Sequence, residues 1–167
     1  MFEEISTNNC LLAIIVRKNF DKPGISFFTP NEFSQQLAYM SHPAGKEIQP
    51  HVHKRVPREV HYTQETLFIR KGKLQVDFYS NNQEYCKSRI LEAGDVILLI
   101  KGGHGFKVLE DLEMFEVKQG PYAGDEDKIK HHIKYRHKIA KVQLENMQLK
   151  LSQICAVIKD KNPSLVK

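Results

Sequence analysis

The sequence predicts an all-β fold of the sandwich or barrel type, followed by a helical extension at the C-terminus. Apolar segments of strand length recur at near-regular spacing, separated by turns rich in Gly, Asn and Pro. This spacing favours an all-β fold over a βαβ fold. Residues 73–79 alternate apolar and polar side chains at the period of a half-buried strand. The 167 residues suffice for one domain with its own hydrophobic core.

The first half of the chain contains short strand candidates. Residues 11–16 form a continuous apolar run that suits a buried strand. Two shorter strands are expected at 25–28 and 37–40, and another should carry the histidines of a His-x-His pattern. Residues 54–64 are charged and contain a proline, which predicts a long loop of the kind that often serves as a lid or binding loop.

The second half gives a clearer strand pattern. A turn at Lys71-Gly72 is expected to separate the strands 66–70 and 73–79, and Gly94-Asp95 is expected to turn the chain into the strand that follows. The remaining strands should span 85–91, 96–100, 106–109 and 113–118.

The C-terminal segment has helical periodicity. Its apolar residues recur at steps of 3, 4 and 7, as in the seam of a coiled coil: Ile133, Ala140, Leu144, Met147, Leu151, Ile154 and Ile158. We expect an amphipathic helix over 138–160 that packs on the barrel or forms the interface of a homodimer, and of these we predict the homodimer. The expected organisation is therefore a barrel over 1–136 and a helix with tail over 137–167.

Composition narrows the class of protein. The net charge of +5 resides in the tail, because residues 128–167 hold ten Lys/Arg against two acidic residues and residues 1–127 carry −3. Aromatic residues do not interleave with the tail's lysines, which argues against a nucleic-acid surface. Three widely spaced cysteines predict no disulfide framework. The chain contains no apolar run of 18 residues, so we expect a cytoplasmic protein without a membrane span.

Three histidines and a glutamate suggest a metal site. His51 and His53 share one side of a strand if that segment is extended. Glu65 begins an apolar strand, and His104 follows a glycine turn. Three imidazoles and one carboxylate suit a single divalent transition metal, with Fe, Mn, Ni, Zn and Co all compatible. Glu59 and His61, within the predicted loop, are rival ligands.

The motifs around these residues resemble those of the cupin superfamily. The first cupin motif is matched by Gly45, His51, His53, Glu65 and Gly72, with a spacer of eleven residues before the glutamate where the family has three or four. The second motif is matched by Gly94, Gly102 and His104, with Ile100 in place of the usual proline and one residue fewer before the histidine. The resemblance implies a double-stranded β-helix, or jelly-roll barrel, and favours Glu65 over Glu59 as the carboxylate ligand.

Residues 117–127 resemble the end of small single-domain cupins often associated with bacterial surface-sugar biosynthesis. This implies a small-molecule substrate of the sugar or sugar-acid class and an isomerase-like or epimerase-like reaction, with the catalytic residues unknown. Side chains expected to contact the substrate are Tyr39, Gln49, Arg55, Gln64 and Phe106. Two alternatives stay open: a non-catalytic ligand-binding module and an Fe(II)-dependent dioxygenase.

Overall fold

The computed structural model describes residues 1–130, 148 and 150–152, and divides the chain into two units, Met1–Ile129 and Lys130–Lys167. In the second unit residues 148 and 150–152 are helical and Lys130 is not, and the rest of the predicted 138–160 helix and its dimer interface lie outside the described residues. Within the described part of the chain, no helix is long and apolar enough to cross a membrane.

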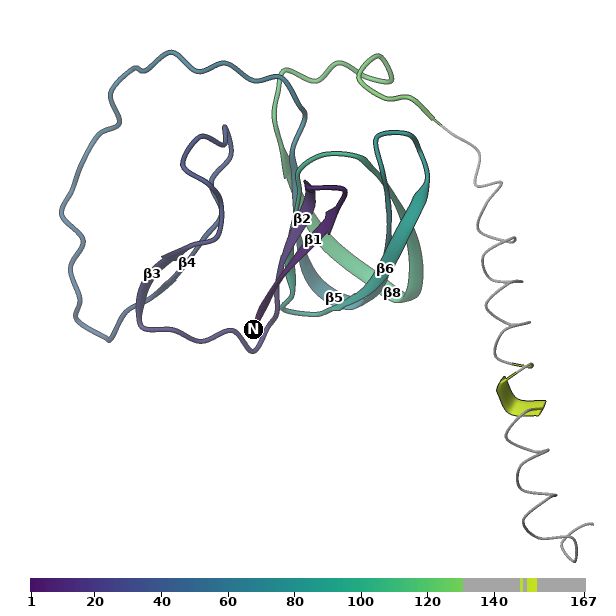
Figure 1. The fold of residues 1–167 in the computed structure, drawn as a ribbon. Coiled ribbons are helices and arrows are strands. Elements are labelled where there is room, and N and C mark those ends of the chain that lie inside the picture. The colour runs from purple at the N-terminus through teal and green to yellow at the C-terminus, as the bar shows by residue number, and fades with distance from the viewer. Residues whose placement is uncertain (131–147, 149, 153–167) are drawn as a thin grey trace, which may run out of the picture. The chain divides into compact units, whose positions relative to one another are not determined.

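The first unit is all-β, as predicted (Figure 1). Its strands in the described residues are β1 (Phe2–Thr7), β2 (Cys10–Val16), β3 (Gly24–Phe27), β4 (Ala38–Ser41), β5 (Glu65–Tyr79), β6 (Tyr85–Glu92), β7 (Val96–Leu99) and β8 (Gly103–Lys118). The strands β3 and β4 form a two-stranded antiparallel sheet, and the other six form one curled sheet in the order β1-β2-β7-β5-β6, with β8 also paired to β5.

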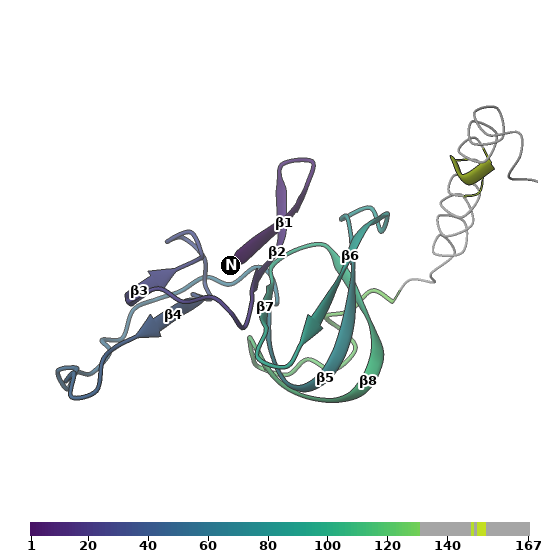
Figure 2. The same ribbon diagram turned by 90° about the horizontal axis from the view of Figure 1, so that it is seen from below.

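The long strand β5 organises the curled sheet. β8 pairs with it along its whole length on one edge. On the other edge β7 pairs with residues 65–68 and β6 with residues 73–79, so β6 and β7 act as successive parts of one bent strand. β2 then continues the sheet beyond β7, and β1 beyond β2. Figure 2 shows β5 and β8 curling side by side into a half-barrel.

The bend in β5 occurs at Gly72. Leu67 and Ile69 contribute to the core before it, and Leu74, Val76 and Phe78 contribute after it, so the buried positions change from odd to even. The pairing of β5 with β8 shifts register three times between Ile69 and Leu74. Such bulges bend a strand and reverse the face on which its side chains lie. The predicted turn at Lys71-Gly72 is therefore wrong, because the strand bends there and continues.

Two apolar clusters lie on opposite faces of β2. Ala13 and Ile15 belong to the main core inside the curl, with the buried residues of β5, β6 and β7. Ile14 and Val16 belong to a second cluster, against which the partly buried Phe20, Phe28, Phe33 and Leu37 pack. A strand that is covered on both faces needs apolar side chains on both, so apolar and polar residues do not alternate along it. This explains the uninterrupted apolar run predicted as a buried strand.

The remaining strand predictions have mixed outcomes. β3, β4, β6 and β7 lie within a residue of their predicted bounds. The predicted strands 106–109 and 113–118 are one strand, β8, and β1 was not predicted at all. The prediction that His51 and His53 lie in a strand is wrong: residues 42–63 contain no strand.

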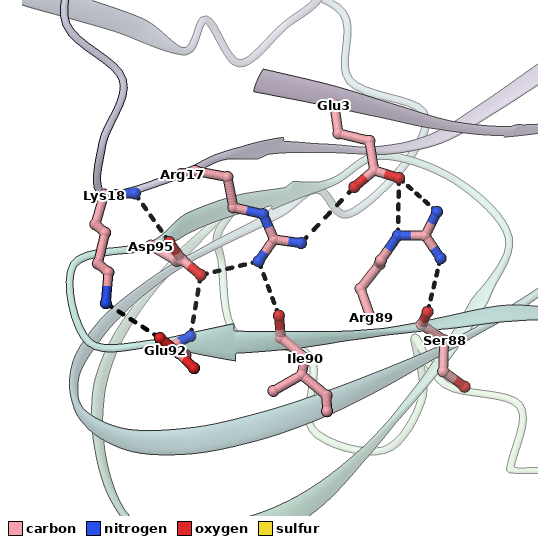
Figure 3. Close-up of polar contacts among 8 residues, drawn as sticks. All are labelled: Glu3, Arg17, Lys18, Ser88, Arg89, Ile90, Glu92 and Asp95. Atoms are coloured by element: carbon pink, nitrogen blue, oxygen red, sulfur yellow. Dashed lines mark hydrogen bonds and ion pairs between the residues drawn. The ribbon is translucent and has the colours of Figure 1, made fainter. Parts of the chain in front are cut away.

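A buried carboxylate and its partners fasten the first hairpin to the bend between β6 and β7 (Figure 3). The buried Asp95 carboxylate accepts hydrogen bonds from the backbone N–H groups of Lys18 at 2.9 Å and Glu92 at 3.0 Å, and it pairs with Arg17 at 3.0 Å. Charge-assisted hydrogen bonds of this kind are the strong ones. Asp95, which follows Gly94 of the second motif, therefore holds the first hairpin to the bend between β6 and β7.

A second charged pair joins β1 to β6. Arg89 donates to the carboxylate of Glu3 through Nε at 2.8 Å and also through a terminal nitrogen. This hydrogen bonding lowers the pKa of Glu3 and raises the pKa of Arg89. The contact spans strands that are not neighbours in the sheet, so it braces the curl from outside the apolar core.

Candidate functional site

The curl of the sheet brings Glu65, at the start of β5, next to His104, at the start of β8. The place where these two residues and Lys118 meet is called the closure below. In the β5–β8 ladder Glu65 pairs with Lys118 and His104 pairs with Phe78, thirteen residues further along β5. A straight strand of that length would separate the two by about 40 Å. Instead, His104 Nε2 lies 3.1 Å from Glu65 Oε2. The bend at Gly72 and the curl of the ribbon are what place these two side chains in contact.

The carboxylate of this pair is buried, whereas the imidazole remains accessible. Glu65 is 7% exposed, and the His104 side chain is 31% exposed. Lys118 Nζ lies 3.8 Å from the other oxygen of Glu65. The hydrogen bond from His104 lowers the pKa of Glu65, and the charges of His104, Lys118 and Lys128 act in the same direction against the effect of burial. Glu65 is therefore a carboxylate held in its charged form.

Buried and half-buried amide side chains fix the start of β5 beside this pair. The backbone N–H of Gln64 donates to the side-chain oxygen of Gln119, and Gln119 Nε2 donates to Gln35 Oε1 at 3.3 Å. Gln35 in turn donates to the Thr66 hydroxyl at 2.6 Å. The buried Gln64 Oε1 has no hydrogen-bond partner among the described residues. A buried acceptor without a partner in that part of the chain marks a place where a ligand donor would be bound favourably.

The structure separates the four predicted metal ligands into two pairs. Glu65 and His104 are in contact, whereas His51 and His53 lie on the exposed coil between β4 and β5, with ring centroids 5.3 Å apart. Among residues 1–130, 148 and 150–152, no group of three or more His, Cys, Asp or Glu side chains is arranged to hold a metal ion. Metal binding by this set stays a prediction.

The rival carboxylate lies elsewhere. Glu59 Oε1 pairs with His61 Nε2 at 3.4 Å, and both side chains are mostly exposed on the coil. Glu65, by contrast, is buried next to His104. The geometry therefore favours Glu65 as the carboxylate of the site, because Glu65 begins β5, and the curl of that strand with β8 places it next to His104.

Of the predicted substrate contacts, some lie beside the Glu65–His104 pair and others lie on the exposed coil or in the second apolar cluster. Phe106 lies beside His104, with ring centroids 5.1 Å apart, and Gln64 precedes Glu65. Gln49 and Arg55 lie on the exposed coil. The Tyr39 ring packs against Phe20 at 5.0 Å in the second apolar cluster, which gives it a structural contact.

Sequence reasoning missed Lys118 and Gln119 as residues of the site. Lys118 is the last residue of β8 and Gln119 follows it, and their proximity to Glu65 depends on the pairing of that strand with β5. Lys118 carries a raised pKa because of its hydrogen bond with Glu116, so it brings a positive charge to the closure. No sequence pattern within residues 117–119 predicts that they lie beside Glu65. Their position follows from the pairing register of β5 with β8.

No family model, curated protein or solved structure matches the chain. The function is therefore argued from the chemistry of the site.

Proposed function

We propose that this protein is a cupin-type, metal-binding protein that acts on a small polar metabolite of the sugar or sugar-acid class, with the chemistry of an isomerase or epimerase. The observation that carries the proposal is the contact between the buried Glu65 carboxylate and the accessible His104 imidazole, with Lys118 beside them. A base oriented by a buried carboxylate is the arrangement used for proton transfer at neutral pH.

Each side chain has a role in this chemistry. In the site without metal, the Glu65 contact engages His104 Nε2, so Nδ1 is the nitrogen that takes a proton from a carbon next to a carbonyl of the substrate and returns it to another position or face. His104 cannot combine this role with binding a metal. The positive charge of Lys118 attracts an acidic group of the substrate or the oxygen that becomes negative. Phe106, beside His104, offers an apolar surface against which a sugar ring packs.

A metal ion fits the donor set but not the arrangement within one chain. Three imidazoles and a carboxylate suit a divalent transition metal, and each of the two pairs, Glu65 with His104 and His51 with His53, is already assembled. Joining the pairs requires residues 42–63 to approach the closure. When bound, the metal supplies a Lewis acid that polarises a substrate oxygen.

The proposal is tested by proton exchange in D2O. Protein stripped with chelator, and protein reloaded separately with Mn, Fe, Co, Ni or Zn, is incubated with sugar phosphates and nucleotide sugars, and loss of a C–H signal is followed by NMR. We expect exchange for at least one compound, reduced about 100-fold or more in His104→Ala. His61→Ala, which alters an exposed imidazole outside the closure, should leave the rate unchanged.

The outcomes separate the alternatives. Equal rates in wild type and His104→Ala would refute the role of His104. Saturable binding of a compound without any exchange would replace the enzyme with a non-catalytic binding module. Exchange that is equally fast in the stripped and the reloaded protein would leave proton transfer in place and remove the metal from the proposal.

A further inference from the structure

Residues 42–63, called the arm below, are exposed along their entire length. They connect β4 to β5. The contacts that the structure shows for residues 42–61 run within the arm, such as the Glu59–His61 pair. Only the last two residues reach the rest of the described chain, through Tyr62 with Lys101 and Thr63 with Asp127. Ile48, Val52, Val56 and Val60 all have exposed side chains, an unfavourable state for a continuous stretch of chain.

The centre of the arm has the pattern of a strand. Residues 51–56 lie between Pro50 and Pro57 and contain no proline themselves. If they are extended, His51 and His53 lie on one face, and Val52 and Val56 lie on the other. Six residues are enough for a strand of ordinary length, and flanking prolines are compatible with an edge position in a sheet.

The curled sheet offers an edge that accepts such a strand. In the described residues β8 pairs only with β5, so its other edge carries unpaired backbone groups along sixteen residues. The β8 residues opposite the core positions Val76 and Leu74 are Phe106 and Val108, which are 41% and 58% exposed. A long, apolar and unpaired edge is a template for pairing with another strand.

The two segments are complementary in charge. The arm holds four Lys/Arg against two Glu, and β8 holds two Lys against four acidic residues. Opposite charges of this kind favour pairing between the segments and disfavour pairing of β8 with a second β8.

We propose that the arm of one copy of this protein pairs with the free edge of β8 in a second copy and delivers His51 and His53 to the Glu65–His104 pair there. Every copy carries both an arm and a free edge, so one twofold axis satisfies both copies at once. The metal that the four side chains would share rests on the proposed function, whereas the pairing of the arm with β8 does not. It also explains why the described part of a single chain leaves the predicted ligands in two separate pairs.

The pairing is tested first by photo-cross-linking of the full chain. Val52 is replaced by p-benzoylphenylalanine, and illuminated protein is analysed on a denaturing gel and by mass spectrometry of peptides. We expect a covalent dimer in which position 52 is joined to residues 103–118. The same photoreactive residue at Gln83, in the exposed turn between β5 and β6, should give no such product. Cross-linked monomers only, or dimers joined elsewhere, would overturn the proposal.

A second test asks whether the site is shared. A chain with His51→Ala and His53→Ala and a chain with His104→Ala are co-expressed under different affinity tags, and the mixed dimer is isolated through both. Neither variant alone should hold the metal. The mixed dimer should recover about half of the wild-type metal content, because an exchanged arm restores one of its two sites.

The two tests separate this inference from the proposed function. Intermolecular cross-links without any metal in the wild type would retain arm exchange and remove the metal. Metal in the wild type, with cross-links inside one chain and no recovery in the mixed dimer, would retain the metal site and refute arm exchange.

Discussion

Gly72 should be the most sensitive glycine of the curl. Its φ of +82° is unfavourable for any residue with a side chain, at about 1–2 kcal/mol. A Cβ at this position would also lie 2.0 Å from the backbone oxygen of Asp111 and 2.8 Å from its carbonyl carbon. Relieving such overlap requires the backbone of β8 to shift, at a further cost of about 1–3 kcal/mol. Gly72→Ala should therefore lose about 2–5 kcal/mol of a total of about 5–15.

Gly45→Ala is the matched control for this prediction. Gly45 has the same φ of +82°, but no atom lies within 4 Å of the position that its Cβ would take. Any gain from a stiffer unfolded chain is common to both variants and cancels in the comparison. The cost of the positive φ is also common to both, so only the overlap of about 1–3 kcal/mol separates them. For a slope of about 2 kcal/mol/M, urea unfolding followed by circular dichroism should give a midpoint lower by about 0.5–1.5 M for Gly72→Ala than for Gly45→Ala. Equal midpoints would show that β8 does not pass close to Gly72, and the reasoning would fail.

Three further predictions concern the buried charges and the histidines. Asp95→Asn should lower the free energy of unfolding by about 1–3 kcal/mol, because it weakens buried charge-assisted hydrogen bonds; an unchanged urea midpoint would contradict this. The His104 hydrogen bond lowers the pKa of Glu65 from 4.5, so the stabilisation is present above that pH and is lost as pH falls through the lower, folded-state value. The stability difference between wild type and Glu65→Gln should therefore shrink on acidification below pH 4.5, and a difference that grows would have the wrong sign. His51→Ala combined with His53→Ala should abolish metal retention measured by elemental analysis, and full stoichiometry in the folded variant would remove both from the ligand set.

Strand positions were predictable where local chemistry agrees with the place of the strand in the fold, as in β6, β7 and the second half of β5. In β5 the residues Leu74, Val76 and Phe78 alternate with polar side chains in the sequence and are buried in the structure. The alternation locates this strand but not its burial, because Asp77 and Tyr79 on the other face are buried as well. Pattern reasoning also succeeds for β2, where both faces are covered and the apolar run is continuous.

Local pattern failed where the decisive contact is distant in sequence. Lys71-Gly72 has the composition of a turn, but β8 pairs with β5 on both sides of it and keeps the strand continuous. The same glycine freedom that permits a turn permits a bulge. Likewise, His51 and His53 have the spacing of a strand, but a strand needs a partner for its backbone groups, and the structure shows none for this segment in the described part of the chain.

The candidate site combines both cases. Glu65 and His104 were identifiable one at a time, the first from the apolar strand that it begins and the second from the glycines before it. Their contact depends on three features. β5 bends at Gly72, β8 stays paired with β5 through the bend, and the connection from β7 to β8 is short. That connection is short because Leu99 pairs with Glu65 itself, so the chain leaves β7 beside the carboxylate and places His104 over it five residues later. A substitution that straightens the curl should therefore separate the pair without altering either side chain. Loss of the His104–Glu65 contact would then report a change in the curl of the sheet even where both side chains are intact.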